Sequence, residues 1–301
     1  MARLLLPVVW VAWGISYPLM SWALEAVDPF TSRLIILPLS GLILLAVGVR
    51  RGAPVVPTRR LWGRIAVTGF FNMGLFQIFL IAGIATLGPS RTPIIIYTMP
   101  AWSALFARFV LHERISPRAA LSLLLSLAAV GIVVSQETAA RAAPVGTLLT
   151  LLAAISFGIG TVLTKRDVLQ GDPAINAAWQ LLTGTLPVVV VWLAFARHAY
   201  FRPDQTRGMA ALVWLILGSN ALAYFCWFQV IKVLPASVAS LTTLVVPCVG
   251  FGSSALLIGG DVSWLDLAAL GLIVVAVSLV LVGRPPANST TVKTQLAKLR
   301  Q

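Results

Sequence analysis

The chain has 301 residues, of which 59 % are hydrophobic and only 10 % are charged. An ordinary globular domain has about 25 % charged residues, so this composition excludes a soluble globular protein. The 22 Lys and Arg residues outnumber the 9 Asp and Glu residues and give a formal net charge of +13, which raises the question of a polyanionic partner.

In chain order, the ionisable residues divide the sequence into ten long stretches that contain no Asp, Glu, Lys or Arg. A helix needs about 20 predominantly apolar residues to cross a bilayer, and the shorter stretches can include apolar neighbours. The first stretch follows Arg3 as a signal peptide would, but it is too long and lacks an Ala-x-Ala cleavage site. The sequence therefore predicts an all-α integral membrane protein with ten transmembrane helices, within Leu4–Leu24, Leu34–Val49, Ile65–Ser90, Thr92–Ala107, Ala119–Gln136, Ala142–Thr164, Pro173–Ala196, Gly208–Ile231, Val233–Gly260 and Leu267–Gly283.

The basic residues lie mainly on one side of this predicted bundle. With ten spans, sixteen Lys and Arg fall on the side of both termini and six on the other side. Lys and Arg favour the cytoplasmic side, so we expect a multi-pass protein of the plasma membrane (the inner membrane of a bacterium) with both termini cytoplasmic. The basic excess then reflects orientation and contact with anionic lipid, and a nucleic-acid partner is not expected.

Short motifs of the first five stretches recur in the same order in the second five. Asp28-Pro29 recurs as Asp172-Pro173 at an offset of 144, and Pro100 recurs as Pro247 at an offset of 147. Because five spans are an odd number, the second half must enter the membrane with the opposite orientation. Secondary transporters use such inverted-topology repeats to place one site near the midplane. We expect two five-helix repeats, 1–141 and 142–284, and a basic cytoplasmic tail, 285–301.

No pattern of catalytic or metal-binding residues is visible. His112-Glu113 lacks the second His of an HExxH site, and His198 has no partner in the sequence. Cys226 and Cys248 form neither a CxxC pair nor a disulfide framework. The predicted loops are too short for a soluble catalytic domain, so we expect neither an enzyme nor a metal or cofactor.

Amide and aromatic residues recur at the spacing of one helical face in two equivalent stretches. Asn72, Phe76 and Phe79 form one stripe, and Asn220 begins the second stripe 148 positions later. Single aromatics are also typical of lipid-facing surfaces and interfacial belts, but Asn is costly in hydrocarbon and favours a protein-lined or water-lined site. The candidate substrate-binding residues are Trp13, Tyr17, Asn72, Phe76, Phe79, Tyr97, Trp102, Phe157, Thr161, Asn220, Tyr224 and Trp227.

Two features of the spans bear on the transport mechanism. Prolines in mid-span remove a backbone donor, which indicates either a static kink or a hinge. The candidate hinge residues are Gly14, Pro100, Gly158 and Pro247. Ionisable residues inside spans usually mark an ion path, and their absence from the ten stretches argues against cation/proton antiport and favours transport without an obligatory proton.

Several short motifs carry a resemblance to a known family. They are Trp13-Gly14 with Phe157-Gly158, Leu87-Gly88-Pro89-Ser90 with Leu234-Pro235-Ala236-Ser237, and the turn His112-Glu113-Arg114-Ile115-Ser116. With the five-plus-five arrangement, they make the chain resemble the drug/metabolite transporter superfamily, specifically its ten-helix EamA-type branch. Within that branch, the aromatic content looks most like the aromatic amino-acid exporters.

The resemblance implies a secondary exporter of neutral amino acids, aromatic or large and apolar, that works by alternating access. Its expected partners are a small-molecule substrate and the lipid bilayer. The alternatives are an exporter of other amphipathic metabolites or drugs, a membrane enzyme acting on lipid, and a subunit that stabilises another membrane protein. The sequence leaves open whether the protein is a monomer or a homo-oligomer.

Overall fold

The computed structural model describes residues 2–112, 117–136, 143–167, 172–195, 198–226, 245–259 and 263–282. The expectation of an all-α protein is confirmed for this part of the chain, where the only extended pairing is an isolated antiparallel bridge between Val27 and Phe201. The elements in chain order are α1 (Ala2–Gly14), α2 (Ser16–Ala26), α3 (Pro29–Arg50), α4 (Arg59–Gly69), the π-helical segment η1 (Phe70–Leu75), α5 (Phe76–Leu87), α6 (Thr92–Ile96), α7 (Met99–Val110), α8 (Pro117–Ser135), α9 (Ala143–Asp167), α10 (Pro173–Phe195), α11 (Thr206–Trp214), the π-helical segment η3 (Leu215–Leu222), α14 (Val245–Leu257) and α15 (Trp264–Val282).

Six helical segments of the described chain are long and apolar enough to cross a membrane. They are Pro29–Arg50, Arg59–Leu87, Thr92–Val110, Pro144–Thr164, Ala174–Phe195 and Thr206–Cys226. A seventh is the pair α1 and α2, which is bent by 42° around Ile15. Shorter apolar helices cover Ala120–Ser135, Val245–Leu257 and Trp264–Leu279, so seven of the ten predicted spans correspond to candidate spans of the described chain and three correspond to shorter helices.

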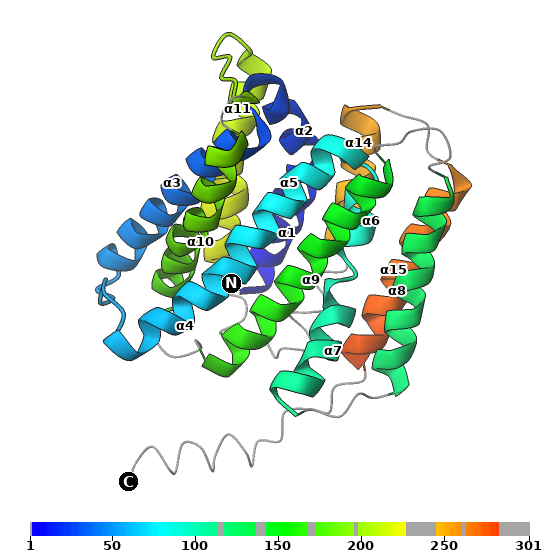
Figure 1. The fold of residues 1–301 in the computed structure, drawn as a ribbon, viewed down its shortest axis with the longest axis horizontal. Coiled ribbons are helices and arrows are strands. Elements are labelled where there is room, and N and C mark those ends of the chain that lie inside the picture. Colours follow the sequence, from blue (N-terminus) through cyan, green and yellow to red (C-terminus); the bar gives the residue numbers. More distant parts are fainter. Residues whose placement is uncertain are drawn as a thin grey trace.

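The helices form one bundle in which neighbours in space are often distant in sequence (Figure 1). α3 packs against α10, α5 packs against α9, and α9 packs in turn against α7. At one edge α15 lies along α8, while α2 contacts α11 and α1 contacts α14. Contacts therefore join the first five predicted spans to the last five throughout the bundle.

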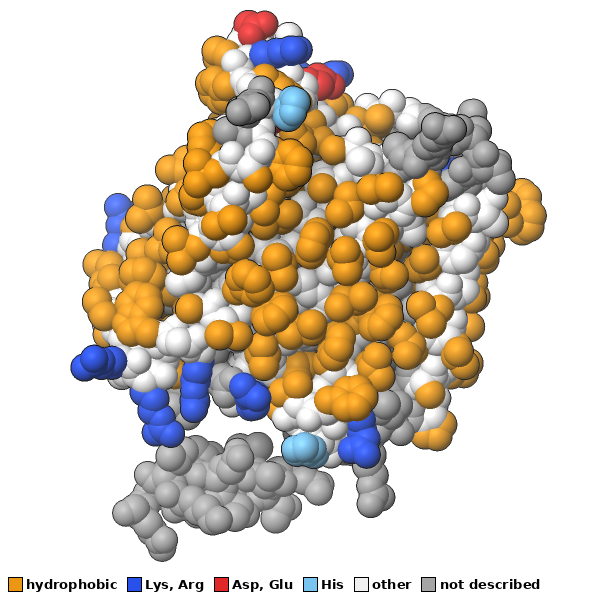
Figure 2. Space-filling model, in the orientation of Figure 1, with side chains coloured by type: hydrophobic (Ala, Val, Ile, Leu, Met, Phe, Trp, Pro, Cys, Tyr) orange, Lys and Arg blue, Asp and Glu red, His pale blue; other side chains and the backbone are white. Residues whose placement is uncertain are grey.

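A belt of apolar side chains covers the middle of the molecule (Figure 2). Strongly exposed large apolar side chains include Phe109, Leu256 and Trp264, and soluble monomers rarely expose such side chains over a large contiguous area. In the same view a row of basic side chains lies below the belt, and the acidic side chains lie above it together with other basic ones. A bilayer around the belt is the environment that this surface fits.

Two aspartates begin equivalent helices in the same way. Asp28 Oδ1 accepts the backbone N–H groups of Phe30 and Thr31 at the start of α3. Asp172 Oδ1 accepts the N–H groups of Ala174 and Ile175 at the start of α10. Both are N-caps with Pro at the first helical position, a combination that begins a helix at a defined residue.

Asp28 also holds the loop before α11 against the turn between α2 and α3. Its Oδ2 accepts the backbone N–H of Tyr200 at 3.3 Å, and its own N–H donates to the Tyr200 carbonyl at 3.1 Å. Burial, together with the Asp28 carboxylate, raises the pKa of the Tyr200 phenol. The Tyr200 hydroxyl donates to the Leu24 carbonyl, so the loop is tied down at both ends of this side chain.

The expectation that no span contains an ionisable residue is wrong, because the spans also include Arg33, Arg64, Arg108 and Arg207. Two charged side chains within the described helices are buried, Arg33 and Asp266. Arg33 lies inside the span Pro29–Arg50 and is fully buried. Asp266 lies in the first turn of α15, where Arg91 Nε and Gln136 Nε2 donate to its Oδ1 at 3.3 and 3.1 Å. Arg33 lies inside the helix because the Asp28-Pro29 cap starts α3 four residues earlier. The sequence-based prediction had taken Arg33 as the boundary of the span.

Candidate substrate site

The two candidate asparagines occupy matching irregularities of the backbone. Asn72 lies in the π-helical segment η1 between α4 and α5, and Asn220 lies in the π-helical segment η3 that follows α11. Single π-helical turns inside α-helices occur frequently at functional sites. Both side chains are buried within the protein, as expected for an amide that avoids hydrocarbon.

Asn72 is the centre of a polar cluster that joins three helices. Its Nδ2 donates to Thr164 Oγ1 of α9 at 3.1 Å and to Gln180 Oε1 of α10 at 3.2 Å. Its Oδ1 is buried and has no hydrogen-bond partner among the described residues. Gly160 of α9 packs directly against this amide, because a Cβ at Gly160 would collide with Asn72 Oδ1. One acceptor is therefore left free at the middle of the bundle.

Asn220 is bound differently. Its Nδ2 donates to the carbonyl of Leu215 in the same π-helical segment at 2.8 Å. Next to it, Ser219 accepts through its carbonyl from Trp13 Nε1 at 3.1 Å and through its hydroxyl from Ser16 at 2.7 Å. Trp13 and Ser16 flank the bend between α1 and α2, so η3 is bonded to that bend.

The candidate aromatic residues pack into one apolar interior. Trp13 lies edge-on to Tyr224 with ring centroids 5.6 Å apart, and the Tyr224 hydroxyl lies 3.6 Å from Met73 Sδ. Phe76 and Phe157 have ring centroids 5.0 Å apart. A single cluster contains Tyr17, Phe76 and Tyr97, with Trp13, Phe79, Trp102 and Phe157 packed against it. The structure thus brings most of the candidate residues together.

Two candidate substrate-binding residues are not part of this group. Thr161 lies on an exposed face of α9. Trp227 lies outside the described residues, as do the tail 285–301 and the motif residues 113–116, 234–237 and 260–262. Of the second predicted stripe, the described residues therefore include only Asn220 and Tyr224.

The candidate hinge residues occupy different local settings. Gly14 ends α1 at the 42° bend, and Pro100 is the second residue of α7, after the turn at Tyr97 and Thr98. Pro247 is the third residue of α14. Gly158 lies within the continuous helix α9. Whether any of them moves stays a prediction.

Gly14 and Gly158 mark equivalent helix crossings. A Cβ at Gly14 would collide with the side chain of Val249 on α14. A Cβ at Gly158 would lie 3.0 Å from Trp102 Cβ on α7. The two glycines are 144 positions apart and their two partners are 147 apart, so the crossing of α1 with α14 and that of α9 with α7 recur at the offsets of the sequence motifs.

Sequence reasoning missed three buried polar residues, Arg33, Gln77 and Gln180, and the half-buried Thr164. Arg33 Nη1 donates to Gln77 Oε1 at 3.0 Å, and Thr164 and Gln180 hold Asn72. The Asp28-Pro29 cap was the signal that would have placed Arg33 inside a helix. The two glutamines stood inside charge-free stretches, where a polar side chain needs a partner as much as Asn does.

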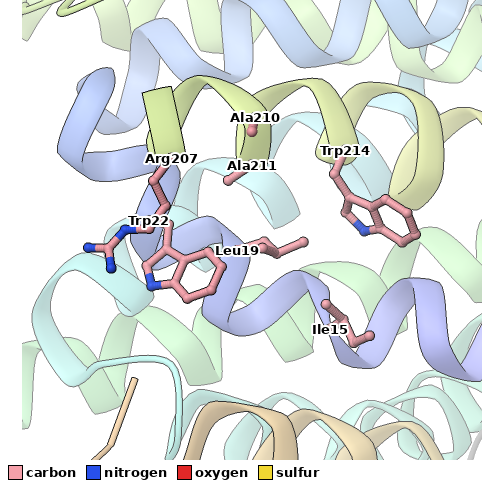
Figure 3. Close-up of a pocket in the computed structure, with 7 residues that line it drawn as sticks. All are labelled: Ile15, Leu19, Trp22, Arg207, Ala210, Ala211 and Trp214. Atoms are coloured by element: carbon pink, nitrogen blue, oxygen red, sulfur yellow. The ribbon is translucent and has the colours of Figure 1, made fainter. Parts of the chain in front are cut away.

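A separate pocket opens between α2 and α11 (Figure 3). It has a volume of about 340 Å³ and is lined by Ile15, Leu19, Trp22, Arg207, Ala210, Ala211 and Trp214. None of the candidate substrate-binding residues lines it. Arg207, one of these lining residues, lies over the Trp22 ring and pairs with Glu25. Among the described residues no group of three His, Cys, Asp or Glu side chains is placed to hold a metal ion.

Comparison with known proteins gives a consistent result over the whole chain. The EamA-like transporter family matches residues 1–135 and 144–282. The chain is 25 % identical to the uncharacterized transporter YvbV of Bacillus subtilis over 92 % of this chain and 90 % of that one. It is 23 % identical to the uncharacterized inner membrane transporter YedA of Escherichia coli over 92 % and 89 %. A solved structure titled "Crystal structure of protein" has a TM-score of 0.66 at 18 % identity and covers 93 % of this chain and 96 % of that one, which shows a shared fold.

Proposed function

The chain belongs to the EamA-like transporter family, and from this premise we propose that it exports neutral amino acids with aromatic or large apolar side chains. It is a membrane transporter and not an enzyme. Its substrate is a small molecule, and the residues that we propose to bind it are the buried aromatics around Trp13, Tyr224, Phe76 and Phe157 together with the amides of Asn72 and Asn220.

We propose further that ten spans form two inverted repeats, 1–141 and 142–284. The two matched segments of the family support this division. The paired π-helical segments and the paired crossings of Gly14 and Gly158 support it independently, because each recurs at the offset of the sequence motifs. The basic residues of the α3–α4 turn, among them Arg50 and Arg59, then lie in the cytoplasm of a bacterial cell with both termini.

The observation that carries the substrate class is the aromatic interior next to two mid-span amides. A zwitterionic amino acid can place its ammonium against a Trp or Tyr face, an attraction of roughly 0.5–2 kcal/mol. The free Oδ1 of Asn72 can accept a hydrogen bond from the same ammonium. The apolar side chain of the substrate would then replace contacts that the aromatic residues now make with one another.

An exporter of other amphipathic metabolites or drugs is the second candidate. The pocket between α2 and α11 favours it, because its lining is apolar except for Arg207. Such a groove suits a substrate that arrives from the lipid rather than from water.

Uptake into liposomes that contain only this protein separates the two candidates. A panel of radiolabelled aromatic, aliphatic and charged amino acids is compared with a hydrophobic amine, and protein-free liposomes give the background. We expect saturable uptake of the aromatic and large apolar amino acids. Uptake of the amine without any amino acid would replace the first candidate with the second.

A further inference from the structure

Arg33 is a cation buried in the membrane-spanning part of the bundle. It is the fifth residue of α3 and is 0 % exposed. Its partner Gln77 lies ten residues before the end of α5, which is about 15 Å along a helix. Arg33 itself is four residues, about 6 Å, from the start of α3, and its buried side chain reaches the more deeply placed Gln77. An ionisable residue at such a depth is costly and usually marks a substrate or ion path.

The hydrogen bonds of Arg33 leave one edge of its guanidinium free. Nη1 donates to Gln77 Oε1 at 3.0 Å, while Nε and Nη2 are buried and have no partner among the described residues. No carboxylate in the described chain lies within ion-pair distance of it. Nε–H and Nη2–H point in the same direction, and this fork is the arrangement that binds a carboxylate through two parallel hydrogen bonds.

Arg33 and Gln77 each neighbour, along their own helix, a residue of the cluster that contains Tyr224. Leu37 follows Arg33 by one helical turn on α3, and Met73 precedes Gln77 by one turn on the same span, so each pair shares a helix face. Leu37 and Met73 belong to the same buried cluster as Tyr224, and Trp13 packs against that cluster. The Arg33–Gln77 pair is thus one helical turn, along each of its two spans, from the cluster that contains Tyr224.

The packing of the helices does not by itself require a charge at this position. The equivalent helix of the second half begins at the matching cap Asp172, and there the offset of 144 places Ala177 where Arg33 stands. Ala177 is also fully buried. A small apolar residue therefore meets the packing needs of the second half, and the arginine is a feature of one half alone.

We propose that the Nε and Nη2 edge of Arg33 binds the carboxylate of the transported substrate, with the apolar part of the substrate against Trp13 and Tyr224. Gln77 is a positioning residue, since its Oε1 holds Nη1 and turns the other edge toward the substrate. The proposal rests on the proposed function and adds the group that selects a carboxylate. Arg33 is closed to solvent here, so the substrate reaches it only when the helices separate, as alternating access requires.

Binding to the purified full-length protein tests the proposal without requiring transport. The probes are L-phenylalanine, 3-phenylpropanoate, which has the carboxylate but no ammonium, and phenethylamine, which has the ammonium but no carboxylate. Affinities come from the rise of the melting temperature in detergent with probe concentration, in a buffer of low ionic strength without added chloride or sulfate. The variants are Arg33→Gln and Arg33→Lys, with Arg202→Gln as the control that removes an exposed charge of the loop before α11.

We expect Arg33→Gln to lower the affinity for both carboxylates by about tenfold or more, as for loss of a charged hydrogen bond. The affinity for phenethylamine should not change. Arg33→Lys should retain part of the carboxylate affinity, and Arg202→Gln all of it. Equal weakening of all three probes by Arg33→Gln would overturn the proposal in favour of a structural role. If neither Arg33 variant can be purified, the affinities of the wild-type protein test the proposal. A wild-type protein that binds phenethylamine as tightly as phenylalanine would contradict a carboxylate site.

Two further outcomes separate this proposal from the proposed function. Binding of 3-phenylpropanoate that depends on Arg33, with no phenylalanine flux in liposomes, would keep the carboxylate site and reject amino-acid export. Phenylalanine flux that Arg33→Gln leaves intact would keep export and reject the site. A rise in melting temperature with added chloride that depends on Arg33, with none for either carboxylate, would assign the guanidinium to an inorganic anion and overturn the proposal.

Discussion

Asn72 and Asn220, 148 positions apart in the sequence, each lie in a π-helical segment that interrupts a membrane-spanning helix. Their bonds differ, because Asn72 joins α9 and α10 whereas Asn220 bonds to its own helix at Leu215. The equivalent backbone places two amides at the middle of the bundle, and the different bonds make only Asn72 a link between helices.

This difference predicts unequal effects of two matched substitutions. Asn72→Ala removes the donor that Thr164 and Gln180 share and leaves a buried amide without its partner, a cost of about 1–3 kcal/mol. Asn220→Ala removes only a local bond and costs about 1 kcal/mol. Melting temperatures in detergent should fall more for Asn72→Ala, and liposome uptake of the amino acid should fall for both. Equal melting temperatures for the two variants would contradict the assigned role of Asn72.

Close packing at Gly160 predicts that one added methyl group disables the site. Gly160→Ala would push its Cβ into Asn72 Oδ1, so we expect loss of most uptake and a lower melting temperature. Gly131→Ala on α8 is the matched control, because a Cβ there meets nothing within 4 Å. It should leave both measurements unchanged. Normal uptake by Gly160→Ala would show that Asn72 does not need its present position.

The aspartate caps give a prediction about stability alone. Asp172→Ala removes the oxygen that accepts two backbone N–H groups at the start of α10 and should destabilise the protein by about 1 kcal/mol, the usual cost of losing a cap. Asp28→Ala also frees the backbone N–H of Tyr200, so its melting temperature should be the lower of the two. Limited proteolysis in the loop before α11 should become faster only in Asp28→Ala. An effect of Asp172→Ala on that loop would be unexpected.

The distribution of basic residues predicts the orientation of the chain. In a background of Cys226→Ala and Cys248→Ala, cysteines are introduced by Gln295→Cys and Asp204→Cys in separate proteins. A membrane-impermeant thiol reagent applied to whole cells should label only Asp204→Cys, and Gln295→Cys should react only after lysis. Labelling of both cysteines in intact cells would contradict an even number of spans with cytoplasmic termini.

The helices could be predicted from the sequence, because a soluble fold does not accommodate ten long stretches without a charge. Their ends were less well predicted, since a charge was taken as a boundary although the Asp28-Pro29 cap starts α3 before Arg33. The interruptions at Asn72 and Asn220 could not be predicted, because a π-helical turn depends on packing between helices that the local sequence does not encode. Thr161 shows the converse limit: repeat equivalence to Tyr17 suggested a buried face, yet α9 leaves this residue exposed.

We still predict transport without an obligatory proton, now on the ground that the two buried charges of the described helices are poor proton carriers. Arg33 is a buried charge, but an arginine side chain does not give up its proton in proteins. Asp266 stands at the start of α15 in an ion pair with Arg91, away from the middle of a span. Neither residue is thus a ready proton carrier between the two sides.

The measurement that tests the central claim most directly is flux of L-phenylalanine in liposomes containing only this protein, with the pH gradient and the membrane potential both collapsed. We predict saturable flux that moves phenylalanine down its own gradient until the two sides are equal. The membrane potential acts on net charge moved, about 2.3 kcal/mol per charge per 100 mV, so it should do little for a zwitterion. Accumulation of phenylalanine only when a proton gradient is imposed, or no flux above protein-free liposomes, would contradict the account.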